Sequence, residues 1–209
     1  MLGESINNSF QRKSTELDLG ENQDTEFCRV ATIDIGTNST HLLIAKVEPK
    51  LNTFSIELAE KSTTRLGERD PDTGELTSIA MNRAFSTLQR FKDLSESYKV
   101  ESLIIAATSA VREAVNGGLF ISEIKKKIGL DVELISGAEE ARLIYLGVLS
   151  GMQFGNKPHL VLDIGGGSTE LILADSSEAR ALTSTKIGAV RLQREFIKKD
   201  PISSQNELF

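Results

Sequence analysis

Residues 160–174 read LVLDIGGGSTELILA, and residues 31–45 read ATIDIGTNSTHLLIA. When Asp34 is aligned with Asp163, the two stretches share Asp, Ile, Gly, Ser, Thr, Leu and Ala at matching positions. Each copy contains an apolar strand, an acidic residue, a turn of small residues and a second apolar strand. The repeat predicts an α/β fold with a duplicated start.

Both turns have the composition of an anion-binding loop. Small residues leave backbone N–H groups accessible and let an anion approach closely. Neither turn is a Walker P-loop, because Gly-Lys-Ser/Thr is absent and a strand, not a helix, follows each turn. One turn alone would fit an ordinary Gly-rich hairpin, whereas the repetition favours two turns that face each other and clamp a phosphate. The candidate phosphate-binding residues are Gly36, Thr37, Asn38, Ser39, Gly165, Gly166, Gly167 and Ser168.

Carboxylates stand beside both turns. Asp163 and Glu170 flank the second turn, and Asp34 precedes the first. Carboxylates next to phosphate-binding amides are ligands that Mg²⁺ prefers, with water and substrate oxygens completing its shell. Asp34 and Asp163 could instead hydrogen-bond their own turns. Glu170 stands where the first copy has His41, so the copies differ where a specific side chain matters.

Two further positions carry candidate chemistry. Ser136 and Glu139 predict a capping box at the start of a helix, and Glu140 follows one position later. Glu140 could orient a water for attack on a phosphoanhydride, but composition alone favours a role with Glu139 at the helix dipole. Arg112 follows a buried strand, where it would suit a phosphate, although an exposed structural arginine fits equally well.

Apolar periodicity outside the repeat predicts a mixed sheet with helices on its faces. Besides the strands of the second copy, the expected strands are 28–35, 41–48, 53–61, 102–107, 132–135 and 180–185. The expected helices are 78–97, 118–127, 136–150 and 189–199. We expect a disordered polar tail over residues 1–27, a first half over 28–142, and the start of a second half over 143–209.

The chain has 209 residues, a formal net charge of −6 and one cysteine, Cys28. The acidic balance argues against a nucleic-acid partner, which needs a basic surface. No apolar run approaches the roughly 20 residues of a membrane-spanning helix, and the polar N-terminus lacks the pattern of a secretory signal. Because a lone cysteine cannot form an intrachain disulfide and suits a reducing compartment, we expect a cytoplasmic protein with no membrane partner.

Six stretches in this order resemble the exopolyphosphatase/guanosine pentaphosphate phosphohydrolase family of the actin-like ATPase superfamily. They span residues 30–197 and read ATIDIGTNSTHLLIA, KSTTRLGE, AATSAVREA, LISGAEEARLIYLGV, LVLDIGGGSTELIL and IGAVRLQREF. The resemblance implies two actin-like (ribonuclease H-like) halves, each a mixed sheet with flanking helices, and a site in the cleft between them. Members of the family continue beyond residue 209, so the second half is expected to be incomplete.

The resemblance also implies roles for individual residues. Glu140 matches the catalytic glutamate that activates the attacking water, and Arg112 matches a motif arginine that faces the phosphate chain. Asp163 and Glu170 match acidic residues linked to a divalent metal, taken as Mg²⁺, with Asp34 as a further candidate ligand. The implied reaction removes terminal phosphate from inorganic polyphosphate.

Two alternatives stay open at this stage. Hydrolysis of the 5′-terminal phosphate of guanosine pentaphosphate fits the same motifs, because both substrates present the same terminal phosphoanhydride. A truncated chain could also be a phosphate-binding module without turnover. A homodimer is possible for a full-length form.

Overall fold

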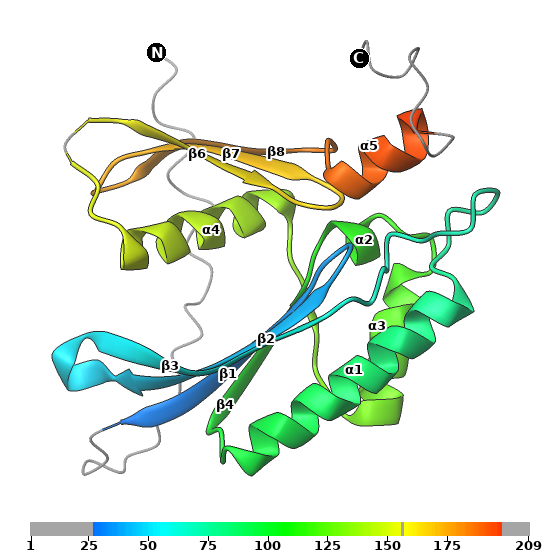
Figure 1. The fold of residues 1–209 in the computed structure, drawn as a ribbon, viewed down its shortest axis with the longest axis horizontal. Helices are drawn as coiled ribbons and strands as arrows, with labels where there is room; N and C mark the ends of the chain where they lie inside the picture. The colour runs from blue at the N-terminus through cyan, green and yellow to red at the C-terminus, as the bar shows by residue number, and fades with distance from the viewer. Residues whose placement is uncertain (1–26, 156, 198–209) are drawn as a thin grey trace, which may run out of the picture.

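The computed structural model describes residues 27–155 and 157–197, which form two lobes, one above the other in Figure 1. Within this part of the chain the strands form a five-stranded sheet in the lower lobe and a three-stranded sheet in the upper lobe. The tail expected over residues 1–27 lies, except for Phe27, outside the described residues. None of the described helices is long and apolar enough to cross a membrane.

The lower lobe is built around its central strand. Its strands are β1 (Cys28–Ile35), β2 (Thr40–Glu48), β3 (Thr53–Ser62), β4 (Ser102–Ala107) and β5 (Glu133–Leu134), with a 3₁₀ turn, η1 (Pro49–Leu51), between β2 and β3. Their order is β3-β2-β1-β4-β5, with β1 antiparallel to β2 and parallel to β4. Ala31, Ile33 and Ile35 alternate inward from β1 and are fully buried, so this strand supplies the middle of the core.

Helices cover one face of the five-stranded sheet, as Figure 1 shows. They are α1 (Ser78–Ser97) and α3 (Gly117–Ile128), and the short helix α2 (Ser109–Arg112) lies at the carboxyl end of β4. Thr77 caps α1 by accepting a hydrogen bond from the Ala80 N–H. Residues 108–112 were expected to form only a turn. The structure has a helical turn there, because the amide of Arg112 donates to the Thr108 carbonyl.

The upper lobe contains the second copy of the repeat. Strands β6 (His159–Ile164), β7 (Thr169–Ala174) and β8 (Ala179–Thr185) form an antiparallel sheet, followed by α5 (Ala189–Phe196). Helix α4 (Gly137–Gly151) packs against β7 and β8, and the hydroxyl of Tyr145 donates to the Asp175 carbonyl. The boundary expected after residue 142 falls inside α4, which packs against strands of the upper sheet.

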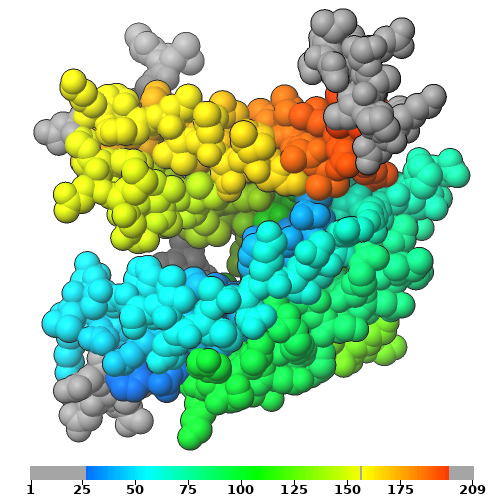
Figure 2. Space-filling view, viewed as in Figure 1, coloured from blue at the N-terminus to red at the C-terminus, as the bar shows by residue number. Residues whose placement is uncertain are grey.

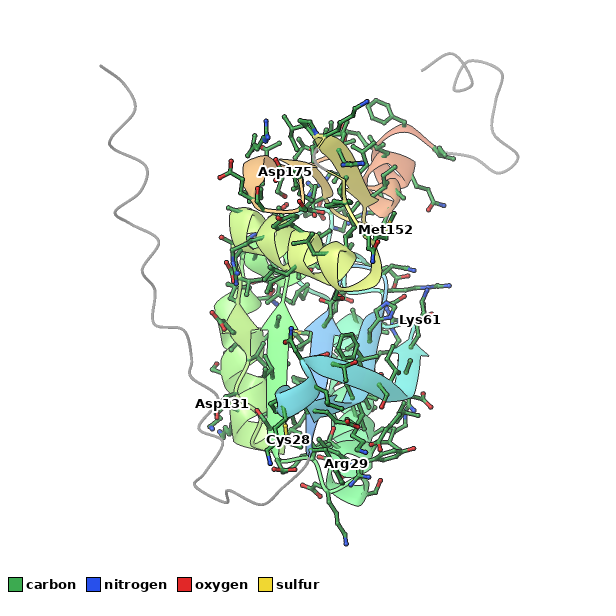
Figure 3. All side chains as sticks on the ribbon, turned by 90° about the vertical axis from the view of Figure 1, so that its left-hand side faces the viewer. Cys28, Arg29, Lys61, Asp131, Met152 and Asp175 are labelled. Atoms are coloured by element: carbon green, nitrogen blue, oxygen red, sulfur yellow. The ribbon has the colours of Figure 1, made fainter. Side chains whose placement is uncertain are left out.

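Most of the expected strands and helices are confirmed to within a few residues. The duplication is confirmed as well, since Asp34 lies opposite His41 in the first hairpin and Asp163 lies opposite Glu170 in the second. Figure 3 shows the lobes from the side, with Asp175 in the upper lobe and Cys28 and Arg29 at the far end of the lower one. Cys28 is buried, as expected for a free cysteine in a strand.

The first strands of the two copies differ in how far their apolar side chains are buried. Ala31, Ile33 and Ile35 are buried beneath α1 and α3, whereas their counterparts Leu160, Leu162 and Ile164 are 60%, 55% and 70% exposed. Among the described residues no further strand pairs with β6 on its open edge. The duplicated hairpins therefore have the same strand pairing, but the apolar side chains of their first strands are buried in one copy and exposed in the other.

The core of the lower lobe gives the first prediction. Phe91 is fully buried beneath the sheet, whereas Ile79 on the same helix is 69% exposed. We expect Phe91→Ala to lower the free energy of unfolding by about 3–5 kcal/mol through lost burial and a cavity. Ile79→Ala should change it by less than about 0.5 kcal/mol. Chemical denaturation measures both, and equal effects would contradict this description of α1.

Candidate functional site

The two Gly/Ser/Thr turns close in the same way and touch each other. The amide of Gly36 donates to the Ser39 carbonyl at 3.1 Å, and the amide of Gly165 donates to the Ser168 carbonyl at 2.9 Å. A Cβ placed on Gly167 would lie 2.6 Å from the Thr37 hydroxyl oxygen. The turns thus meet face to face, as the repeat predicted, and their role in phosphate binding remains a prediction.

Ser109, at the start of α2, joins the same contact. Its hydroxyl lies 2.9 Å from that of Thr37, and it would lie 2.5 Å from a Cβ on Gly167. The carboxyl end of β4, which leads into α2, is the edge where ligands usually bind in open α/β sheets. The first turn, the second turn and the start of α2 therefore converge on one point.

An arginine of α5 secures this junction. Arg191 Nε donates to the carbonyl of Gly167 at 2.9 Å, and Arg191 Nη2 pairs with Glu113 Oε2 at 2.6 Å. Because Glu113 directly follows α2, this one side chain ties the second turn to the lower lobe. Sequence reasoning gave Arg191 little weight, since nothing local marks an arginine that will bridge two lobes.

The carboxylate of Glu140 lies against Arg112. Glu140 Oε2 accepts a hydrogen bond from Arg112 Nη1 at 3.3 Å, and the same nitrogen donates to the Ile135 carbonyl at 2.8 Å. The pKa of Glu140 is raised to about 7, mainly because its carboxyl is buried and also because Glu170 is near, while Arg112 partly offsets both effects. The charge of Asp34 adds a smaller increase to this pKa. The carboxylates of Glu170 and Asp34 thus lie close enough to Glu140 to disfavour its charged form.

The neighbouring Glu139 has a different role. Its amide donates to the Ser136 hydroxyl at 3.1 Å, and its carboxylate pairs with Arg142 one turn later. Ser136 therefore caps α4 as predicted, whereas the Glu139 carboxylate is engaged with Arg142 and Glu140 lies against Arg112. The structure separates two adjacent glutamates that composition alone could not.

The carboxylates of the two hairpins have different surroundings. Glu170 is fully buried, and the Ser184 hydroxyl donates to its Oε1 at 2.7 Å. Loss of hydration raises the pKa of Asp34; the nearby His41 lowers it, and the charge of Asp163 raises it. Asp34 and Asp163 are part of one charged region although they belong to different lobes.

The described residues offer few side chains that could bind a metal ion together. In residues 27–155 and 157–197, no group of three or more His, Cys, Asp or Glu side chains could hold a metal ion. Mg²⁺ in phosphoryl-transfer sites usually takes one or two carboxylates and fills its shell with water and substrate phosphates. Asp163 and Glu170, directly opposite each other on β6 and β7, fit that smaller requirement. Binding of Mg²⁺ by them, or by Asp34, remains a prediction.

Contact between the turns gives a second prediction. We expect Gly167→Ala to lower the free energy of unfolding by about 1–3 kcal/mol, because the new methyl group would overlap Ser109 and Thr37. Gly118→Ala is the matched control, since Gly118 is an exposed position of α3 where a Cβ meets nothing within 4 Å. The control should gain about 0.5–1 kcal/mol. A neutral Gly167→Ala in denaturant titrations would contradict the close contact.

The raised pKa of Glu140 gives a third prediction. A carboxyl with a folded pKa of about 7, against 4.5 when unfolded, favours folding below pH 4.5 and loses that contribution as the pH rises through 7. Without metal, we expect Glu140→Gln to be more stable than the parent at pH 8 by about 2–3 kcal/mol. The difference should shrink toward pH 4.5. Thermal or chemical unfolding across this range measures it, and a destabilised variant at pH 8 would contradict the burial argument.

Comparison with known proteins identifies relatives that match most of this chain. A guanosine-5′-triphosphate,3′-diphosphate pyrophosphatase of Photobacterium profundum is 36% identical over 177 residues, covering 84% of this chain and 35% of the relative. One of Vibrio cholerae is 37% identical over 168 residues, covering 79% and 33%. The chain thus spans about a third of the length of these curated relatives.

Two solved structures are similar in fold and sequence. An exopolyphosphatase from Cytophaga hutchinsonii has a TM-score of 0.80 and 37% identity, covering 86% of this chain and 57% of that one. A PPX-GPPA enzyme from Aquifex aeolicus has a TM-score of 0.72 and 35% identity, covering 87% and 60%. Residues 43–208 match the model of the Ppx/GppA phosphatase family. This chain belongs to the Ppx/GppA phosphatase family.

Proposed function

We propose that this chain carries the site of a phosphoanhydride hydrolase that releases terminal phosphate from inorganic polyphosphate. The observation that carries the proposal is the position of Glu140, partly buried against Arg112 and close to the carboxylates of both hairpins. Two facing turns of small residues lie at the same junction of the lobes and suit a phosphoryl group. A base, a cation and an anion cradle are the parts that this reaction requires.

In this proposal Glu140 acts as the general base. Its carboxylate accepts a proton from a water molecule as the water oxygen attacks the terminal phosphorus, and the bond to the bridging oxygen breaks. A pKa of about 7 suits this task, since an effective base has a pKa close to the working pH. Arg112, anchored to the Ile135 carbonyl, holds the Glu140 carboxylate and offers its remaining donors to phosphate oxygens.

The turns and the hairpin carboxylates complete the proposed site. Backbone amides of residues 36–39 and 165–168 would bind the non-bridging oxygens of the terminal phosphate. Asp163 and Glu170, with Asp34 nearby, would hold Mg²⁺. When bound, this ion would neutralise charge on the phosphate oxygens.

A second substrate is favoured by the comparisons. The curated relatives from Photobacterium profundum and Vibrio cholerae are both named guanosine-5′-triphosphate,3′-diphosphate pyrophosphatases. Guanosine pentaphosphate carries a terminal phosphoanhydride of the same kind as polyphosphate, so the same base and turns would serve. Competition between the two substrates for one preparation of the protein would rank them.

The general-base role gives a fourth prediction. We expect Glu140→Gln to lower the rate of phosphate release from polyphosphate by about 10²–10⁴-fold, because the amide cannot accept the proton. Glu139→Gln is the matched control and should retain activity, since Glu139 pairs with Arg142 at the helix start. In the parent, the rate should rise with pH through about 7 as Glu140 loses its proton.

Two outcomes would count against the proposal. Full activity of Glu140→Gln would remove Glu140 as the base. Thermal stabilisation by polyphosphate without any phosphate release, with Mg²⁺ present, would instead favour a binding module, because a ligand that binds only the folded state raises its stability. The second outcome is a real alternative for a chain that spans about a third of its curated relatives.

A further inference from the structure

The start of α5 holds the second turn from one side. The Ala189 amide donates to the Gly165 carbonyl at 2.9 Å. The amides of Val190 and Arg191 both donate to the Gly166 carbonyl, at 3.0 and 3.1 Å. The first N–H groups of a helix have no partner within the helix, so they are available for such contacts. The backbone of α5 therefore fixes the direction of two peptide groups in the turn.

The side chain of Arg191 fixes a third peptide group. Its Nε donates to the Gly167 carbonyl at 2.9 Å. A trans peptide group is planar, so its C=O and the N–H of the following residue point in opposite directions. Since the carbonyls of residues 165–167 are bound by α5, the amides of residues 166–168 point away from it. No acceptor among the described residues receives a hydrogen bond from these three amides. Successive amides with one orientation suit an anion.

Close packing makes the turn depend on the position of α5. A Cβ placed on Gly188, the residue before the helix, would lie 2.5 Å from backbone atoms of Gly166 and Gly167. The helix therefore begins directly against the backbone of the turn, with no side chain of residue 188 between them. A displacement of α5 would displace the turn with it.

Arg191 also connects the turn to the other lobe. Its Nη2 pairs with Glu113 Oε2 at 2.6 Å, and the two side chains are 30% and 14% exposed. Partial burial strengthens such an ion pair relative to one in open solvent. In Figure 1, α5 lies above α2, which Glu113 directly follows. The direction of the peptide group between residues 167 and 168 is therefore tied to the contact between the lobes.

We propose that Arg191 is a positioning residue of the hydrolase: it aims the Ser168 amide at the terminal phosphate, and its ion pair with Glu113 makes this aim depend on contact between the lobes. The inference rests on the proposed function and adds a residue that acts through the backbone of the turn. Arg191 takes no part in bond making. An amide displaced by about 1 Å loses most of the stabilisation that it gives the transition state, so loss of Arg191 should lower kcat.

The first test compares Arg191→Met with Arg180→Met in assays of phosphate release from polyphosphate. Arg180 pairs with Asp175 at 2.6 Å, at the opposite end of β7 from the second turn. We expect Arg191→Met to lower kcat about 10²-fold, with KM changed by less than about threefold. Arg180→Met also removes an ion pair of the upper lobe, and it should keep the kcat of the parent even where it lowers the melting temperature.

Two further variants separate positioning from general damage. Arg191→Lys keeps the charge, but its ammonium lacks the planar fork that reaches the Gly167 carbonyl and Glu113 together, so its kcat should lie between those of the parent and Arg191→Met. Glu113→Ala should lower kcat as well. Combined with Arg191→Met, it should have less effect than the product of the two single effects, because the two side chains act as one pair. The rise of the rate with pH through about 7 should remain in every variant, since the groups that set the pKa of Glu140 are unchanged.

The outcomes distinguish this inference from the proposed function. If the parent releases phosphate and Arg191→Met keeps its kcat, or if Arg180→Met loses as much, the positioning role is overturned and the hydrolase stands. If Arg191→Met does not fold, Arg191→Lys decides, and a kcat equal to that of the parent overturns the role. If the parent releases no phosphate, calorimetric titration with inorganic phosphate is the test. Weaker binding to Arg191→Met than to Arg180→Met then supports the role while the hydrolase fails, and equal binding overturns both.

Discussion

The arrangement of this protein depends on the contact between its two Gly/Ser/Thr turns. Gly167 lies so close to Thr37 and Ser109 that a methyl group at residue 167 would overlap both hydroxyl oxygens. Arg191 donates a hydrogen bond to the Gly167 carbonyl and forms an ion pair with Glu113 of the other lobe. Figure 2 shows the consequence: the lobes touch at one end, beneath α5, and leave a hollow between them at the other.

That contact also concentrates negative charge, and the charge has a cost in stability. Glu140, Glu170 and Asp34 come from α4, β7 and β1, yet the last two both raise the pKa of Glu140. A structure built for stability alone would separate these carboxylates or neutralise each of them. Carboxylates that raise one another's pKa in this way are typical of functional sites, and lower stability is the usual consequence of such a site.

Much of this organisation was predictable because it is local. The alternation of apolar residues in β1 and the spacing in α1 follow from the periods of strands and helices. Ser136 and Glu139 mark the start of α4 by chemistry within a single turn, and the repeat revealed the duplicated hairpins. The turn predicted over residues 108–112 was wrong only in its conformation, since the amides of Arg112 and Glu113 donate to the carbonyls of Thr108 and Ser109 and form a helical turn.

The sequence by itself determined the strands, the helix caps, the paired turns and the types of residue available for chemistry, because each depends on neighbours close along the chain. Only the tertiary structure decided that Glu140 meets Arg112, that Ser184 donates to Glu170, and that Arg191 joins the second turn to Glu113. These pairings depend on how two lobes pack, and packing is set by shape and burial over the whole molecule. No local pattern distinguishes an arginine that bridges two lobes from an arginine on an open surface.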